Sequence, residues 1–142
     1  MYIETSVISY LTGRPSRDMV IAAHQELTRQ WWDTRGSAFE LLVSELVREE
    51  SAGGDAEASR KRIAAIDTVP VLRANEAAVA LAERPVSQGP IPQESAADAL
   101  HIAVAAVNGI DCLLTWNCKH LANASHRQRI EALVEAAAMS AR

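Results

Sequence analysis

Oxygen-bearing side chains follow strand-like runs at both ends of this chain. Glu4 comes directly after the short run "MYI", and Asn117 lies just past "DCLLT", which has the composition of a buried strand. The carboxyl ends of parallel strands meet at one edge of a sheet, and sites in α/β proteins form outside that edge. We therefore expect Glu4 and Asn117 to lie on the same edge of a sheet.

Further carboxylates lie on segments that we expect to be helical. Asp98 lies near the start of an alanine-rich helix expected at 93–108, where free N–H groups and the helix dipole also tolerate an anion without any catalytic role. Glu45, Glu49 and Glu50 crowd a shorter helix. Glu45 and Glu49 share one face, whereas Glu50 lies about 100° around the axis from Glu49, so only one side of this cluster can face a site.

Converging carboxylate and amide oxygens suit a hard divalent cation, because Mg²⁺ and Mn²⁺ prefer oxygen ligands. Such an ion can polarise a phosphodiester, orient an attacking water and lower the pKa of that water. A histidine-rich zinc site is not indicated. His101 lies in an apolar helical stretch and is more typical of a packed or hydrogen-bonded histidine than of a ligand, and the other histidines are scattered.

The glycine and proline breaks are short, which indicates loops within one domain spanning residues 1–142. We expect strands at about 1–4, 38–45, 68–72 and 111–115, and helices from residue 6 and at about 17–34, 46–52, 56–66, 75–84, 93–108 and 124–140. Asp55 is an expected helix cap, and Asn75 or its neighbour is expected to cap the helix at 75–84. Pro70 indicates an irregular or edge strand, and Pro85 is expected to begin a loop. Alternating strands and helices predict a parallel α/β sheet with helices on both faces.

The composition suits one globular domain. The 142 residues are 49% hydrophobic and 23% charged, enough for a core that needs no disulfide or structural metal. The net charge of −4 excludes a protein that binds nucleic acid through overall positive charge, although a local basic patch is compatible with it. No apolar run approaches the ~20 residues of a membrane span, and no signal pattern opens the chain, so we expect a cytoplasmic protein without membrane contact.

Four segments resemble the successive motifs of PIN-domain proteins, particularly the VapC-type toxins of bacterial toxin–antitoxin pairs. In chain order they are "YIETSV", "LVREESAGG", "AADALHIAVA" and "LLTWNCKHLAN", and together they span nearly the whole chain. The resemblance implies a three-layer α/β/α fold with a mainly parallel central sheet of about four strands. It also implies a ribonuclease that depends on Mg²⁺ or Mn²⁺.

The resemblance implies a catalytic and metal-binding set made of Glu4, Glu50, Asp98 and Asn117. Glu4 stands where the family usually has Asp, and its extra methylene shifts the carboxylate by about 1.5 Å, a displacement that can cost a large factor in rate. Glu50 matches the helix carboxylate that precedes a glycine, and Glu49 is the alternative if the register differs by one residue. Asn117 matches a position that is Asp or Asn in the family, and it adds no negative charge.

Supporting roles also follow from the resemblance. Thr5 and Ser6 form the turn after the first-strand acid, and Thr115 would orient the loop that carries Asn117. The hypothesis of an RNA-cleaving enzyme also makes basic side chains candidates for contacts with RNA phosphate: Arg14, Arg17, Lys119, His120, Arg127 and Arg129.

The main hypothesis is a metal-dependent endoribonuclease, the toxin of a toxin–antitoxin pair, that cleaves RNA and binds a cognate antitoxin. An apolar helical face with Leu27, Trp31 and Trp32 is a candidate partner surface, although these residues could instead pack internally or at the seam of a homodimer, which we also expect. The alternative is a catalytically silent PIN module that binds RNA or protein, which predicts weak divalent-ion binding. A nucleotide-binding Rossmann-like domain is disfavoured because the glycines form neither GxGxxG nor GxxxxGK.

Overall fold

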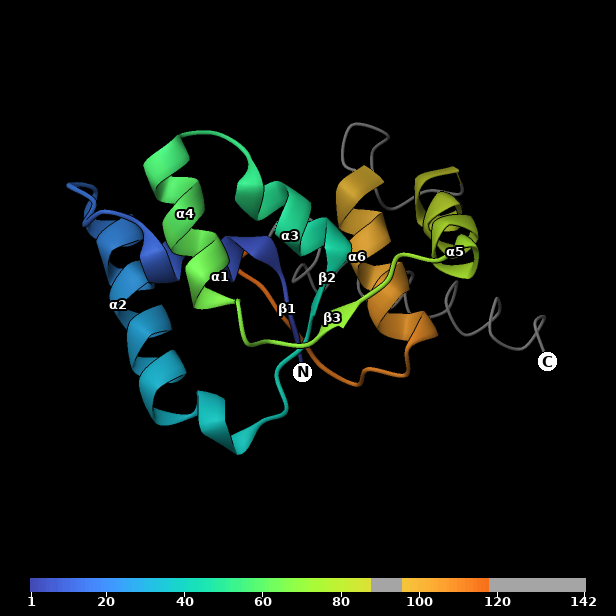
Figure 1. Cartoon of the computed structure of the whole chain (residues 1–142), viewed down its shortest axis with the longest axis horizontal. Coiled ribbons are helices and arrows are strands. Elements are labelled where there is room, and N and C mark those ends of the chain that lie inside the picture. The colour runs from blue at the N-terminus through green and yellow to red at the C-terminus, as the bar shows by residue number, and fades with distance from the viewer. Residues whose placement is uncertain (88–95, 118–142) are drawn as a thin grey trace.

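The computed structural model of the chain describes residues 1–87 and 96–117, which form a helix-rich mixed α/β fold (Figure 1). The expected α/β class is confirmed, whereas three-layer packing around a sheet of about four strands stays a prediction. The strands are β1 (Tyr2–Ile3), β2 (Val43–Ser44), β3 (Val71–Leu72) and β4 (Leu113–Leu114). The helices are α1 (Thr5–Thr12), α2 (Met19–Thr34), α3 (Glu45–Ala52), α4 (Ala56–Ala65), α5 (Glu76–Ser87) and α6 (Ala96–Val107), with a 3-10 turn η1 (Gly36–Ala38).

The strands pair in parallel, as the alternation of strands and helices predicts. Strand β1 pairs with β4, with Tyr2 opposite Leu113, and β2 pairs with β3. A single parallel bridge between Tyr2 and Leu42 joins the two pairs, and the Ile3 N–H donates to the Leu42 carbonyl at 2.9 Å. The carboxyl ends of β1, β2 and β4 therefore point toward the same edge, where Glu4 follows β1.

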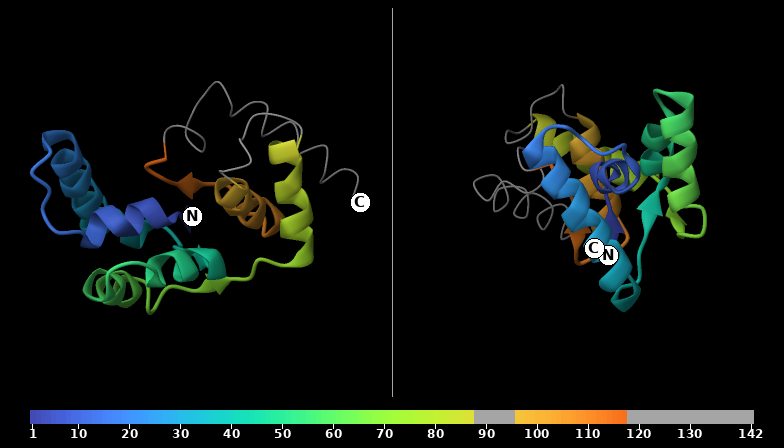
Figure 2. Two further views of the ribbon diagram at one scale, coloured as in Figure 1. Left: turned by 90° about the horizontal axis from the view of Figure 1, so that it is seen from above. Right: turned by 90° about the vertical axis from the view of Figure 1, so that its left-hand side faces the viewer.

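The helices pack in pairs around these strands. Helix α1 contacts α2, α3 and α4, and α5 packs along α6. In Figure 1, α1, α2 and α4 lie at one end of the molecule and α5 and α6 at the other, with the strands between them. The left view in Figure 2 shows the same separation of the α5–α6 pair from α2. The edge where β1 and β4 end is therefore flanked by α1 and α2 on one side and by α6 on the other.

Two of the expected helix caps are confirmed. The Asp55 carboxylate accepts the Ala58 N–H at 2.9 Å at the start of α4, and the Asn75 side-chain oxygen accepts the Ala78 N–H at 2.9 Å at the start of α5. Both side chains satisfy a backbone donor that the first turn of a helix leaves unpaired.

The loop expected at Pro85 was wrong, because α5 continues to Ser87. Proline removes one backbone hydrogen bond from a helix, and here the loss falls near the end of a helix that packs along α6. The strand expected at 38–45 is shorter, since only Val43–Ser44 pairs as β2. Strand β4 was expected to be buried but is half-buried, because within the described residues it pairs with β1 alone.

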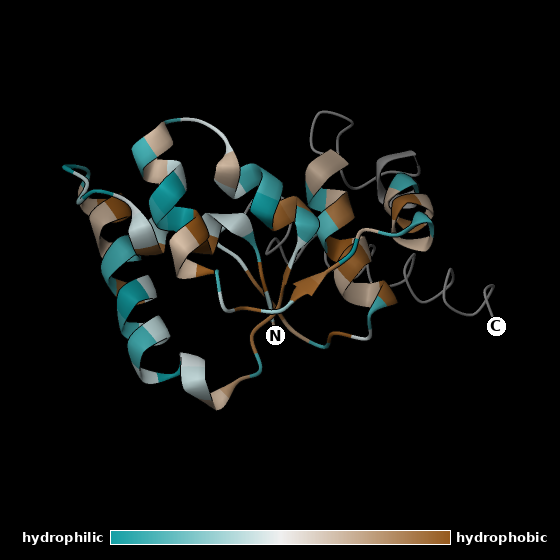
Figure 3. Ribbon diagram, in the orientation of Figure 1, coloured by the Kyte–Doolittle hydropathy of each residue, from teal (hydrophilic) through white to brown (hydrophobic). Residues whose placement is uncertain are grey.

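The core is built from β1, β2, the start of α1 and the small residues of α6. Tyr2 and Ile3 are fully buried, and the small side chains of Ala99 and Ala103 let α6 pack closely against the rest of the core. Figure 3 shows the apolar residues concentrated on the strands and on α6. Helix α6 begins within the expected range and is followed by Gly109, which has a positive φ of 68°. The expected helix at 124–140 lies outside the described residues.

We predict that Gly109→Ala lowers the free energy of unfolding by about 1 kcal/mol, because a Cβ is strained in the left-handed region. Space is not the cause, since nothing lies within 4 Å of an added Cβ at Gly109. Gly53→Ala is the matched control, as Gly53 has a φ of −82° and its added Cβ would meet the Glu50 carbonyl at an ordinary 3.5 Å. Urea unfolding measures both changes, and equal stability of the two variants would contradict the backbone conformation at Gly109.

Candidate functional site

Glu4 lies at the expected edge and caps α1. Its Oε2 accepts the Ser6 N–H at 2.6 Å, and its Oε1 accepts the hydroxyls of Ser6 at 2.8 Å and Thr115 at 2.7 Å. The residue is 6% exposed. Ser6 and Thr115, both predicted to support the site, thus hold the first-strand carboxylate in a fixed orientation.

Glu50, on the last turn of α3, meets the first turn of α1 and the middle of α6. Its Oε1 accepts the Thr5 hydroxyl at 2.6 Å and is 2.7 Å from His101 Nε2, whereas its Oε2 accepts no hydrogen bond from the described residues. Burial opposes ionisation of Glu50, but the hydrogen bonds from His101 and Thr5 outweigh it and lower the pKa of the carboxyl. Glu50 therefore faces α1, whereas Glu49 makes no hydrogen bond or ion pair with the described residues.

Glu50 contacts the segment that carries Glu4, because Thr5 directly follows Glu4 and donates to Glu50. Asp98 lies in the first turn of α6, one turn before His101, and is half-buried; it makes no hydrogen bond or ion pair with the described residues. The Asn117 N–H donates to Thr115 Oγ1 at 2.9 Å, which places Asn117 in the loop after β4.

No group of three or more His, Cys, Asp or Glu side chains in residues 1–87 and 96–117 is placed to hold one metal ion. The chemistry of the oxygen ligands nevertheless fits a hard cation. Glu50 Oε2 and the Asp98 carboxylate accept no hydrogen bond from the described residues, and the lowered pKa keeps Glu50 ionised at neutral pH. Glu4 has less capacity left, because three hydrogen bonds already reach its two oxygens.

A buried polar network behind Glu50 was not foreseen. The Tyr2 hydroxyl lies 2.7 Å from Ser44 Oγ and 2.6 Å from His101 Nδ1. Burial raises the pKa of Tyr2, so its hydroxyl stays protonated. The expectation that His101 is hydrogen-bonded inside the fold is confirmed, since the residue is 1% exposed. Its spacing of three residues from Asp98, which puts both on one helix face, was the sequence signal for a link to the site.

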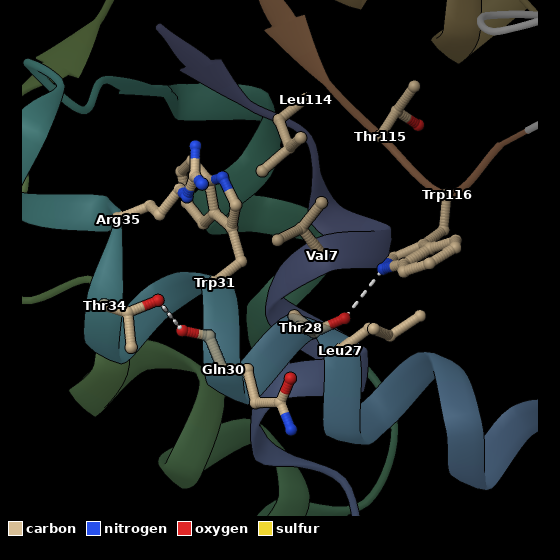
Figure 4. A pocket seen from close by; sticks show the side chains of 10 residues that line it. All are labelled: Val7, Leu27, Thr28, Gln30, Trp31, Thr34, Arg35, Leu114, Thr115 and Trp116. Carbon is tan, nitrogen blue, oxygen red and sulfur yellow. Dashed lines mark hydrogen bonds between the residues drawn. The ribbon is translucent and has the colours of Figure 1, made fainter.

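Trp116 ties the loop after β4 to α1 and α2. The backbone N–H of Trp116 donates to Ser6 Oγ at 2.9 Å, and its indole N–H donates to Thr28 Oγ1 at 2.8 Å. The Trp116 ring stacks on the His24 ring, with the ring centroids 4.1 Å apart. A pocket of about 420 Å³ lies beside it, and Figure 4 shows Trp31 across this pocket from Trp116. The full lining is Val7, Leu27, Thr28, Gln30, Trp31, Thr34, Arg35, Leu114, Thr115 and Trp116.

The candidates for phosphate contact divide between described and undescribed residues. Arg14 forms an exposed ion pair with Glu57 at 3.4 Å, a geometry that contributes little to stability and leaves the guanidinium accessible. Further candidates lie outside the described residues: Lys119, His120, Arg127 and Arg129.

Comparison of the chain with protein-family models, with curated proteins and with solved structures found no match. Membership of the PIN-domain family therefore stays a prediction from the four motifs. Within the described ranges, no helix is both long enough and apolar enough to cross a membrane.

We predict that Glu50→Gln destabilises the metal-free protein at neutral pH and that this effect shrinks in acid. The folded pKa of Glu50 lies below its ordinary value of 4.5, so ionised Glu50 contributes stability above pH 4.5 that is lost as the pH falls through the folded pKa. The difference in Tm between parent and variant should narrow below pH 4.5. Exposed Glu49→Gln is the control, with no such trend expected. A Tm difference between the parent and Glu50→Gln that stays constant from pH 7 to pH 3 would contradict the lowered pKa of Glu50.

Proposed function

We propose that the chain is a metal-dependent endoribonuclease that hydrolyses RNA phosphodiester bonds. The supporting observation is the contact of Glu50 with Thr5, the residue that follows Glu4, at the edge where β1 and β4 end. Sites of α/β proteins form at that edge. The lowered pKa of Glu50 supports the proposal further, because perturbed ionisable groups cluster at functional sites.

In this proposal the acidic residues hold the metal ion, and their hydrogen-bond partners orient them. Mg²⁺ or Mn²⁺ held by Glu4, Glu50 and Asp98, with the Asn117 amide nearby, would supply polarisation of the scissile phosphate and activation of water. Thr5 and His101 keep Glu50 ionised and oriented. Ser6 and Thr115 do the same for Glu4. Without a cation the carboxylates repel phosphate, so substrate binding at this edge requires the ion.

The second candidate is a catalytically silent module that binds RNA or protein. The observation that favours it is the commitment of Glu4, whose carboxylate caps α1 and accepts three hydrogen bonds. In the described part of the chain, the acidic residues form no three-ligand group. The silent module predicts weak divalent-ion binding, whereas the nuclease predicts binding that depends on Glu50.

We predict that the purified chain cleaves single-stranded or loop-containing RNA only with Mg²⁺ or Mn²⁺. Glu50→Gln and Asp98→Asn should each lower the cleavage rate by at least about 100-fold, because each removes a charge from the site at nearly constant volume. Glu49→Gln, one residue from Glu50 but without its contacts to Thr5 and His101, should cleave at the parental rate. Gel-based RNA cleavage assays measure all four proteins. Full-rate cleavage in excess chelator, or parental rates in both site variants, would contradict the proposal.

We also propose that the chain is the toxin of a toxin–antitoxin pair and that its antitoxin binds over α2. The support is an unusual exposure of apolar side chains there, with Met19 at 86% and Leu27 at 54%, next to the pocket lined by Trp31. Exposed apolar patches mark protein contacts. A homodimer that covers the same face stays a competing prediction.

We predict that expression of the chain alone arrests growth of its host, and that co-expression of the neighbouring small reading frame relieves the arrest. Glu50→Gln is the control, because a nuclease that has lost its site should be harmless at equal expression. Leu27→Glu should weaken capture of the small protein without changing RNA cleavage. Harmless expression of an active parent nuclease would contradict the toxin role, and unchanged capture by Leu27→Glu would contradict the location on α2.

A further inference from the structure

A buried chain of hydrogen bonds runs from strand β2 through β1 and α6 to Glu50. Ser44 Oγ lies 2.7 Å from the Tyr2 hydroxyl, which lies 2.6 Å from His101 Nδ1, and His101 Nε2 lies 2.7 Å from Glu50 Oε1. Ser44 and Tyr2 are 0% exposed and His101 is 1% exposed. Only the Glu50 end reaches solvent, with 35% of its side chain exposed.

The Glu50 end of the network sets the direction of its hydrogen bonds. Glu50 is a carboxylate and only accepts, so His101 Nε2 carries a hydrogen. In the neutral ring Nδ1 is then an acceptor, so the Tyr2 hydroxyl donates to Nδ1 and the Ser44 hydroxyl donates to Tyr2. Ser44 Oγ also accepts the Val47 N–H at 3.2 Å. Each buried polar side chain of this network then has a partner, which matters because an unpaired polar group at a buried position is costly.

We propose that Tyr2 and His101 are positioning residues that hold Glu50 by one oxygen and leave the other free for a ligand. Tyr2 fixes the tautomer and the ring of His101, and His101 with Thr5 holds Oε1. Oε2 stays available to a divalent cation. Hydrogen-bonded partners of ligand residues fix ligand orientation in this way, and their loss typically costs 10-fold to 100-fold in metal affinity. The effect of Tyr2 and His101 on catalysis rests on the proposed function, whereas the tautomer of the His101 ring is independent of it.

The tautomer is measured by nitrogen-15 NMR of the metal-free full chain labelled on histidine, with the His101 signals assigned from their loss in His101→Gln. We expect the neutral ring to carry its proton on Nε2 and none on Nδ1. Tyr2→Phe should shift the Nδ1 signal, because it removes the hydroxyl and keeps the ring. A neutral ring with its proton on Nδ1 would overturn the assignment. The parent spectrum decides this point even if Tyr2→Phe does not fold.

The positioning role is measured by calorimetric titration with Mn²⁺ alone. We expect Tyr2→Phe to weaken Mn²⁺ binding about tenfold and His101→Leu to weaken it more. His101→Gln keeps an amide donor toward Glu50 and should recover most of the loss. In a Glu50→Gln background, His101→Leu should cause no further change, because it acts through Glu50. A purely structural role would instead predict additive losses and no rescue by Gln.

These outcomes separate the inference from the proposed function. A parent that binds Mn²⁺ but does not cleave RNA contradicts the nuclease and leaves the positioning test intact. An active parent whose Mn²⁺ affinity is unchanged in folded Tyr2→Phe and His101→Leu contradicts the positioning role alone. A parent that binds no Mn²⁺ contradicts both the metal-dependent nuclease and the role of Glu50 Oε2.

Discussion

The burial of strand β1 is the constraint on which the rest of the structure depends. Its two residues, Tyr2 and Ile3, are fully buried and hydrogen-bond to β4 on one side and to Leu42 on the other. The next residue, Glu4, caps α1, so the strand also sets where that helix begins. Because Tyr2 reaches His101 on α6, the same strand connects the two ends of the molecule.

Two demands compete at Glu4. A carboxylate that caps a helix is held tightly by N–H and hydroxyl donors, and a carboxylate that binds a cation needs free lone pairs. Glu4 meets the first demand with three hydrogen bonds, whereas Glu50 keeps Oε2 uncommitted. Burial opposes ionisation of Glu50, but the hydrogen bonds from His101 and Thr5 lower its pKa, so Glu50 carries a charge that can recruit an ion. The proposed chemistry therefore centres on Glu50, with Glu4 in part a structural residue.

Local sequence signals predicted local structure well. Asp55 and Asn75 cap their helices as expected, because the capping bond joins residues three apart in the chain. The loop predicted at Pro85 was wrong because the packing of α5 along α6 outweighed the local preference of proline for a helix end. The choice between Glu49 and Glu50 depended on the rotation of α3, which burial of Val47 decides.

Contacts between residues far apart in the sequence could not be predicted from local sequence signals. The bond between Tyr2 and His101 joins residues from opposite ends of the chain and is visible only once β1 and α6 are packed. Trp116 likewise meets Thr28 and His24 only because β4 ends beside α2. The sequence indicated which carboxylates to consider, and the fold decided which side chains each of them contacts.

The most direct measurement is an anomalous difference map from a crystal of the full chain soaked in Mn²⁺. The account predicts a peak at coordination distance, about 2.1 Å, from Glu50 Oε2, with the Asp98 carboxylate turned toward the same ion. The same soak of Glu50→Gln crystals should show no peak there. A parent crystal with no Mn²⁺ at Glu50, or with the ion bound only at other carboxylates, would contradict the account.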